Sequence, residues 1–264
     1  MWDTAAWVTL TYSEETVPQT PEGLLTLRRE DVPLFIKRLR FAIYPLKIRV
    51  YIRSEYGDEP TERPHYHLVI YGYPQCLRGQ SFFNPNTNSC CPHCDLIRDA
   101  WGHGNITSQP FCEENARYLA KYSTKNLRQK DNPDLYGREP EKTWGSNRPG
   151  LGTAYMHEVA STLLEYNFEE VVDVPSTLRF GGKIRPLGPT LTRKLRQYMG
   201  REPNAPIARI MEKLAELEPI RKAAFESAAP GHKHYAYKSA LIELGHGKRI
   251  QLAAKARRQR KGKI

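Results

Sequence analysis

The sequence predicts an α+β fold in which helices pack against an antiparallel sheet, and two observations indicate it. Segments 7–12, 47–55 and 65–71 alternate apolar and polar residues, a period of two that is typical of strands with two unlike faces. Residues 57–64 form a polar turn between the last two segments, so we expect a hairpin with a long loop. Segments with helical periodicity lie between and after these strands, and they are expected to cover the apolar face of the sheet.

Several of the expected helices carry start or stop signals in the sequence. Asp31 is placed to cap a helix that runs to about Ile43, and Pro45 ends it. The stretch 131–152 is expected to be mostly loop, and 181–189, with two Pro and three Gly, is expected to be a linker or a small β element. Further helices are expected over 94–101, 113–127 and 155–168 and, in a basic segment, from residue 190 onward.

The charge of the chain favours a polyanionic partner. With 40 Lys and Arg against 29 Asp and Glu, the net charge is +11 and the isoelectric point is about 9.4. Each cation that meets a phosphate releases a counterion, so this surplus favours nucleic acid, although a merely soluble basic protein has the same composition. The last residues are expected to bind phosphates without sequence preference or to form a solvated extension; their cations are Lys248, Arg249, Lys255, Arg257, Arg258, Arg260, Lys261 and Lys263.

Targeting and energy-coupling motifs are not expected in this sequence. No run approaches the roughly 20 apolar residues of a membrane span, so no membrane partner is expected. The N-terminus has no basic region and carries Asp3 early, which is unlike a secretory signal, and we therefore expect a cytoplasmic protein. No GxxxxGK[ST] motif is found, so unwinding of DNA would depend on another protein.

A candidate metal site lies on the polar face of the hairpin. His65 and His67 are two residues apart, which places their imidazoles about 7 Å apart on one face of a strand. Glu55 is close to the end of the preceding strand, so the hairpin would bring its carboxylate to the same place. Two nitrogens and one carboxylate oxygen suit Mg²⁺, Mn²⁺ or a later transition metal and leave positions open for a substrate. Plain solvent exposure of a polar sheet face is the alternative.

A second candidate constellation lies on the helix expected over 113–127. Because each residue turns a helix by about 100°, Tyr118, Lys121, Tyr122 and Lys125 fall on one stripe. A basic amphipathic helix with aromatic anchors has the same spacing. The chemical interpretation is a tyrosine nucleophile: a nearby cation and a metal-polarised phosphate favour attack by a phenolate whose ordinary pKa is about 10. Two tyrosines one turn apart could alternate, one holding a strand while the other cuts.

Four of the five cysteines form a dense cluster between residues 76 and 94. Cys91 and Cys94 make a CxxC pair, which suits one half of a tetrahedral zinc site. Cys76 would supply part of the other half, and its partner is left open among Cys90, Cys112, His93 and His103. The candidate structural zinc ligands are therefore Cys76, Cys90, Cys91 and Cys94, with free thiols as the alternative.

These motifs together resemble those of HUH endonucleases, and among them the replication initiators of microviruses, small circular single-stranded DNA phages. The resemblance is carried by Thr9-Leu-Thr-Tyr12, by His65-Tyr66-His67 and by Tyr118-x-x-Lys121-Tyr122, in that order. It extends over about residues 5–200. Additional matching pieces are Glu55-Tyr56-Gly57, Arg63-Pro64, Trp101-Gly102 with Gly104, and Arg148-Pro149-Gly150-Leu151-Gly152; residues 123–126 depart from the family pattern.

The resemblance implies a fold and a mechanism. The fold would be an antiparallel sheet of about five strands with flanking helices, and the tyrosine helix would lie over the histidine face. His65, His67 and Glu55 would bind the catalytic Mg²⁺ or Mn²⁺. Tyr122 and Tyr118 would be the candidate nucleophiles that form a 5′-phosphotyrosine with origin DNA, with Lys121 and Lys125 assisting. The free 3′-OH would then prime a host polymerase, and a host helicase would unwind the duplex.

The resemblance also suggests a division of the chain and leaves other functions open. We expect an endonuclease domain over 1–189, with a cysteine-rich insertion at about 74–96, and a helical, basic extension over 190–264. The expected function is nicking and rejoining of single-stranded DNA at an origin hairpin or origin sequence, to start rolling-circle replication of a small phage genome. The alternatives are a plasmid initiator, relaxase or transposase of the same superfamily, or a zinc-bearing DNA-binding protein without enzymatic activity.

Overall fold

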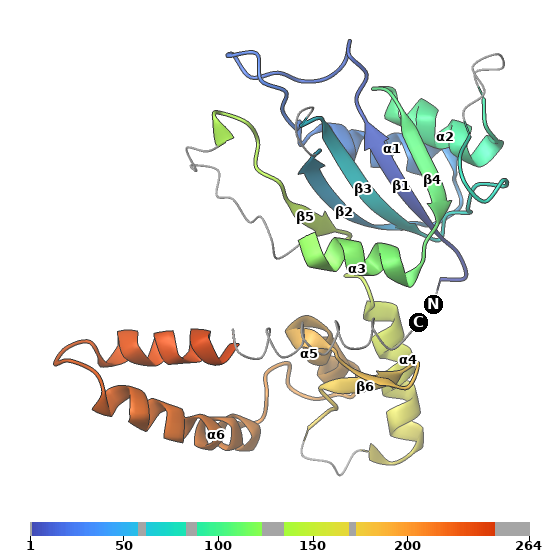
Figure 1. Ribbon diagram of the computed structural model, residues 1–264. Coiled ribbons are helices and arrows are strands. Elements are labelled where there is room, and N and C mark those ends of the chain that lie inside the picture. The colour runs from blue at the N-terminus through green and yellow to red at the C-terminus, as the bar shows by residue number, and fades with distance from the viewer. Residues whose placement is uncertain (1, 58–61, 83–88, 123–134, 169–172, 246–264) are drawn as a thin grey trace, which may run out of the picture. The chain divides into compact units, whose positions relative to one another are not determined.

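The structure is a computed structural model that describes residues 2–57, 62–82, 89–122, 135–168 and 173–245 (Figure 1). The chain divides into two compact units, Met1–Tyr155 and Met156–Ile264. The predicted domain boundary at residue 189 is a separate, functional division and stays a prediction. The basic residues from 246 onward, which the sequence suggested for phosphate binding, lie outside the described residues.

The first unit contains a five-stranded antiparallel sheet in the order β4-β1-β3-β2-β5. The α+β prediction is thereby confirmed. The short strand β5 was not expected, because the segment 131–152 has no period-two pattern and three residues are too few to show one. The strands are β1 (Ala5–Thr11), β2 (Arg49–Tyr56), β3 (Pro64–Tyr71), β4 (Ile106–Pro110) and β5 (Thr143–Gly145).

The register of the central strands places chemically related side chains opposite each other. Glu55 of β2 pairs with His65 of β3, and Arg53 pairs with His67. On the other side of β3, Thr9 of β1 also pairs with His67. Since directly opposed residues point to the same face of a sheet, these side chains share one face. The alternating residues of the same strands point to the other face.

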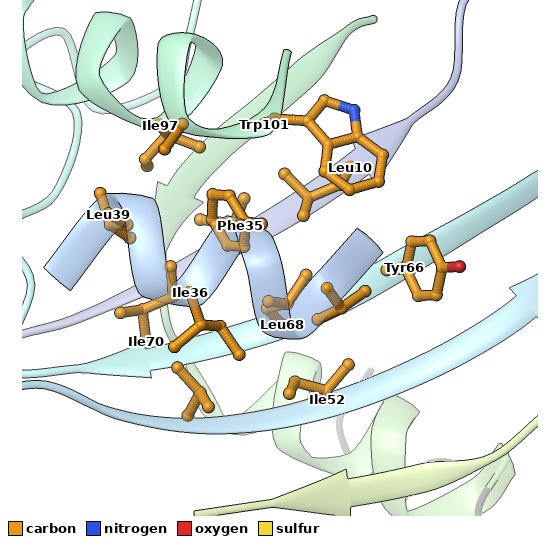
Figure 2. Packing of buried hydrophobic residues seen from close by; sticks show 14 of the residues in the cluster. Leu10, Phe35, Ile36, Leu39, Ile52, Tyr66, Leu68, Ile70, Ile97 and Trp101 are labelled. Carbon is orange, nitrogen blue, oxygen red and sulfur yellow. The ribbon is translucent and has the colours of Figure 1, made fainter. Parts of the chain in front are cut away.

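That other face forms the core with two helices, α1 (Asp31–Ala42) and α2 (Pro92–Trp101). Figure 2 shows aliphatic side chains of the sheet packed against Phe35 and Ile36 of α1 and against Ile97 and Trp101 of α2. Full burial of each large apolar side chain stabilises the fold by about 1.5–3 kcal/mol. The residues from the strands in this cluster include Val8, Leu10, Val50, Ile52, Tyr66, Leu68 and Ile70.

The predicted capping role of Asp31 is wrong. Helix α1 begins at Asp31 itself, and no side-chain cap closes its first turn. The carboxylate is buried and accepts a hydrogen bond of 2.7 Å from the hydroxyl of Tyr12 and bonds of 3.0 Å from Nε of Arg28. Because these groups occupy the carboxylate, it ties the end of β1 to the start of α1 instead of bonding helical amides.

Helix α3 (Glu113–Tyr122) lies across the opposite face of the sheet (Figure 1). Its Leu119 is buried against Trp7 of β1 and Val69 of β3. This small apolar contact fixes which side of the helix faces the strands. The helix was expected to run to residue 127, but residues 123–134 lie outside the described part of the chain.

The second unit begins within helix α4 (Thr153–Glu165) and contains the hairpin of β6 (Thr177–Phe180) and β7 (Lys183–Pro186). The small β element expected near 181–189 is thereby confirmed. Two helices follow, α5 (Gly188–Tyr198) and α6 (Ile207–Glu226), and residues 233–245 are also helical. None of the helices in the described ranges combines the length and the apolar composition that a membrane span requires.

Candidate functional site

The carboxylate of Glu55 lies between the two histidines of β3. Its Oε1 is 3.2 Å from Nε2 of His65 and 3.0 Å from Nε2 of His67. One ligand atom of each residue lies within 4.8 Å of the other two. The sheet register brings them together, as the hairpin predicted, because β2 and β3 pair from Arg49–Tyr71 to Tyr56–Pro64. Their role as metal ligands stays a prediction.

Both imidazoles are held from behind through Nδ1. Nδ1 of His65 lies 3.0 Å from the backbone carbonyl of Arg63, which can only accept a hydrogen. Nδ1 of His67 lies 3.0 Å from Oγ1 of Thr9, and the indole of Trp7 stacks on the His67 ring with centroids 5.1 Å apart. A neutral imidazole whose Nδ1 carries the hydrogen presents the Nε2 lone pair to a cation, so this donor set fits a divalent ion.

The charges at this site favour an ionised carboxylate. Burial opposes ionisation of Glu55, but hydrogen bonds from His65, His67 and Tyr118 outweigh it and hold the pKa of Glu55 well below its usual range. Burial likewise opposes the charged form of His65, yet its hydrogen bond with Glu55 raises the pKa of His65 above the ordinary value. The carboxylate thus carries a full negative charge at neutral pH, as a metal ligand must.

A buried ion pair supports Glu55 from the side of β2. Arg53 is fully buried, and its guanidinium donates a hydrogen bond of 2.8 Å to Glu141. Nε of Arg53 faces Oε2 of Glu55 at 4.0 Å. Among the described residues neither of these two atoms has a hydrogen-bond partner, so Oε2 retains lone pairs that a cation could use. Glu141 was missed in the sequence, because it lies in a segment without periodicity.

Tyr118 reaches the same carboxylate from helix α3. Its hydroxyl donates a hydrogen bond of 2.5 Å to Oε1 of Glu55. Its ring meets those of His67 and Trp7 edge to face, with centroids 5.3 Å and 6.1 Å away. Of the candidate catalytic residues, the structure therefore places Tyr118 beside the histidines and the glutamate.

The other candidates on the tyrosine helix are placed less completely. Tyr122 and Lys121 belong to the last turn of α3, but their side chains are not among those described. Lys125 lies outside the described residues. The roles expected for these three residues therefore stay predictions.

The cysteine cluster comes together away from this site. The four Sγ atoms of Cys76, Cys90, Cys91 and Cys94 lie within 4.8 Å of one another, and all four residues are buried. The remaining alternatives for the fourth position are engaged elsewhere. Cys112 is exposed and donates to Asn115, Nδ1 of His93 faces the carbonyl of Gln75, and His103 lies near Asp31.

Comparison with known proteins gives similarity to phage replication proteins. Residues 5–127 match the family model described as replication-associated protein ORF2. The replication-associated protein VP4 of Bdellovibrio phage phiMH2K is 32% identical over 136 residues, which cover 48% of this chain and 40% of that protein. The replication-associated protein ORF2 of Spiroplasma virus 4 is 30% identical over 160 residues, which cover 58% and 47%. No solved structure shows significant similarity.

These matches confirm the resemblance to phage rolling-circle replication initiators that the motif order indicated. The family match lies wholly within the first unit and contains Glu55, His65, His67 and Tyr118. It also contains the four clustered cysteines. The chain spans less than half the length of the curated relatives that it matches.

Proposed function

We propose that this chain, whose residues 5–127 match phage replication-associated proteins, starts rolling-circle replication by cutting and rejoining one DNA strand through a tyrosine. One observation carries the proposal. The hydroxyl of Tyr118 lies 2.5 Å from the carboxylate oxygen that also faces both histidines. A potential nucleophile and a potential metal-binding set therefore meet at one atom, Oε1 of Glu55.

Each residue of the set has a distinct part in binding a cation. Glu55, His65 and His67 would hold a divalent ion, Mg²⁺ or Mn²⁺, which when bound would polarise an oxygen of the scissile phosphate. The carbonyl of Arg63 and the hydroxyl of Thr9 keep the imidazoles oriented. A set of three protein ligands leaves coordination positions for a phosphate.

Tyr118 would form the covalent bond to DNA. Its phenolic oxygen attacks the phosphorus, the bond from phosphorus to the 3′ oxygen breaks, and the departing 3′ oxygen takes up a proton in exchange for the one that the phenol loses. The products are a 5′-phosphotyrosine and a free 3′-OH. Because the ester replaces one phosphodiester by another, the reverse attack by a 3′-OH reseals the strand without ATP.

The second tyrosine and the lysines extend the proposal along helix α3. Tyr122 follows Tyr118 by about one helical turn, so it could cut a second time while Tyr118 holds the strand. Lys121 and Lys125 would place positive charge near the phosphate. The DNA partner would be a single-stranded origin inside the host cell, and the 3′-OH would serve a host polymerase together with a host helicase.

A labelled oligonucleotide pool tests this function without knowledge of the origin. The pool carries a randomised central segment and a fluorophore at the 3′ end, and it is incubated with the full chain and Mn²⁺ or EDTA. Attack on an internal phosphate joins the 3′ fragment to the protein, so a fluorescent protein band on a denaturing gel is expected with Mn²⁺ alone. The His65→Ala/His67→Ala variant should give no band.

The control for folding is the Thr107→Val variant, which changes an exposed residue of β4. It should form the adduct as well as the unchanged chain does. Tight binding of the pool with no adduct at any Mn²⁺ concentration would favour the non-enzymatic DNA-binding protein instead. An adduct that persists in EDTA and in the double histidine variant would overturn the metal-dependent mechanism.

A further inference from the structure

We propose that Cys76, Cys90, Cys91 and Cys94 bind a structural zinc ion that fastens helix α2 to the edge of the sheet at β4. The site is separate from the histidine site and contains sulfur ligands alone. It would be present whether or not the chain cuts DNA. The sulfur spacing, the amides around the sulfurs and the contacts of the neighbouring chain support it independently.

The spacing of the sulfurs fits a shared tetrahedral ion. Sγ of Cys76 lies 3.8 Å from Sγ of Cys90 and 3.8 Å from Sγ of Cys91. With zinc–sulfur bonds of about 2.3 Å, the edges of a tetrahedron are about 3.8 Å long. A disulfide would bring two sulfurs to about 2.05 Å and would leave the others unpaired or in a second bridge. The four thiols thus surround one point instead of forming pairs.

Backbone amides point at these sulfurs. The amide of Phe82 donates a hydrogen bond of 3.2 Å to Sγ of Cys90. The amide of Arg78 is directed at the sulfur of Cys76, and those of Leu77 and Cys94 are directed at the sulfur of Cys91. Amide donors stabilise the negative charge that four thiolates around one Zn²⁺ would leave in a buried place.

The ligands come from two parts of the chain that the sheet alone does not join. Cys76 follows β3, whereas Cys91 immediately precedes α2 and Cys94 lies in the first turn of that helix. Pro92 between them is the first residue of α2, a position where the missing amide hydrogen breaks no helical hydrogen bond. A metal bound by all four would therefore hold the start of α2 against the chain that leaves β3.

The same segment covers an edge of the sheet. Strand β4 is the terminal strand of the sheet, and Ile106 packs against the cysteine cluster. The amide of Ser81 donates to the carbonyl of Ser108 at 2.7 Å, and the amide of Ser108 donates to Oγ of Ser81 at 2.8 Å. These bonds satisfy edge groups of β4 that would otherwise be open to other strands.

A clamp on β4 also bears on the tyrosine helix. β4 ends at Pro110 and α3 begins at Glu113, so only two residues separate them. The position of β4 therefore limits where α3 can start. Zinc at the cysteine cluster would act as a distant support of α3, without contact with the histidines or with Tyr118.

Metal analysis of the full chain tests the zinc site. The protein is purified under reducing conditions from zinc-containing medium, dialysed briefly against EDTA and analysed by mass spectrometry for metals. We expect one zinc per chain. The Cys76→Ser and Cys94→Ser variants should lose it, whereas Cys112→Ser, which changes the exposed cysteine, and His65→Ala/His67→Ala should keep it.

Two measurements on the unchanged chain keep the test decisive if a cysteine variant does not fold. Replacement of zinc by Co²⁺ should give the strong thiolate-to-cobalt absorption and the visible bands of a tetrahedral sulfur site, and titration of thiols after denaturation in EDTA should find all five cysteines free. One free thiol would mean two disulfides and would overturn the proposal. Zinc lost from the double histidine variant but retained by Cys94→Ser would overturn it as well.

Discussion

The hydroxyl of Tyr118 and Nε2 of His67 approach the same carboxylate oxygen, Oε1 of Glu55, at 2.5 Å and 3.0 Å. The tyrosine comes from helix α3 and the histidine from strand β3, so the oxygen joins the helix to the sheet. This contact places the phenol at the point where a bound cation would hold a phosphate. The predictions below concern this oxygen and the parts of the fold around it.

Replacement of Glu55 by Gln should weaken Mn²⁺ binding at least about tenfold, because the charged ligand between the two imidazoles is lost. Titration of the purified chain with Mn²⁺, followed by electron paramagnetic resonance, measures the affinity. Glu14→Gln is the matched control, since Glu14 is 79% exposed and pairs with Arg63 at the surface. Equal affinities of the two variants would show that Glu55 is not a ligand.

Replacement of Thr9 by Val should lower the affinity for Mn²⁺ by about tenfold while the fold stays intact. Valine has nearly the shape of threonine but cannot bond to Nδ1 of His67, so the imidazole loses its orienting partner. The same Mn²⁺ titration applies. Thr107→Val, at the position paired with Thr9 on β4, should leave the affinity unchanged. Equal losses in both variants would point to a general effect on the sheet.

Gly104→Ala should destabilise the first unit by about 3 kcal/mol. Gly104 has a φ of +141°, and a Cβ there would lie 2.3 Å from the amide nitrogen of Ser13 and 2.6 Å from the carbonyl oxygen of Thr11. Gly102→Ala should cost about 1–2 kcal/mol, because φ is +66° but the nearest atom is 3.8 Å away. Urea unfolding followed by tryptophan fluorescence reports this unit, which contains all four tryptophans. Equal costs would contradict the close approach at Gly104.

The ion pair of Asp173 and Arg196 should make the second unit sensitive to acid. Two hydrogen bonds of 2.7 Å from Arg196 hold the pKa of Asp173 below its ordinary value. A lowered pKa means that the stabilisation is complete above the unfolded pKa, about 3.9, and is lost as the pH falls through the folded pKa. Asp173→Asn should therefore remove about 3 kcal/mol at pH 7 and flatten the loss below pH 5.

Hydrogen exchange of peptides from α5, followed by mass spectrometry, measures this effect in the second unit alone. Glu212→Gln is the control, because Glu212 and Arg209 form an exposed ion pair whose loss should change stability little. A variant Asp173→Asn whose exchange has the same pH dependence as the unchanged chain would contradict the assignment.

Much of the site follows from short-range patterns in the sequence. A period of two assigns the faces of β2 and β3, and the hairpin then brings Glu55 opposite His65. The pattern cannot supply Arg53's partner, because Glu141 precedes a three-residue strand without recognisable alternation. The carboxylate of Asp31 looked like a cap because the tertiary contacts with Tyr12 and Arg28 are invisible in the local sequence.

Long-range packing decides what helical and cysteine spacing leave open. Helical period places Tyr118 and Tyr122 on one stripe but does not tell which side of the helix faces the sheet. The burial of Leu119 against Trp7 and Val69 sets that rotation. In the same way, a CxxC pair predicts half of a zinc site, and only the fold brings Cys76 and Cys90 to it.

Identification of the tyrosine that carries DNA tests the central claim most directly. The chain is incubated with the 3′-labelled pool and Mn²⁺, the adduct is digested with a protease and a nuclease, and the modified peptide is sequenced by mass spectrometry. We expect the first adduct on Tyr118, and we expect Tyr118→Phe to reduce its formation at least about 100-fold, while Tyr122→Phe retains it. An adduct found only on Tyr122, formed equally well by Tyr118→Phe, would contradict the account.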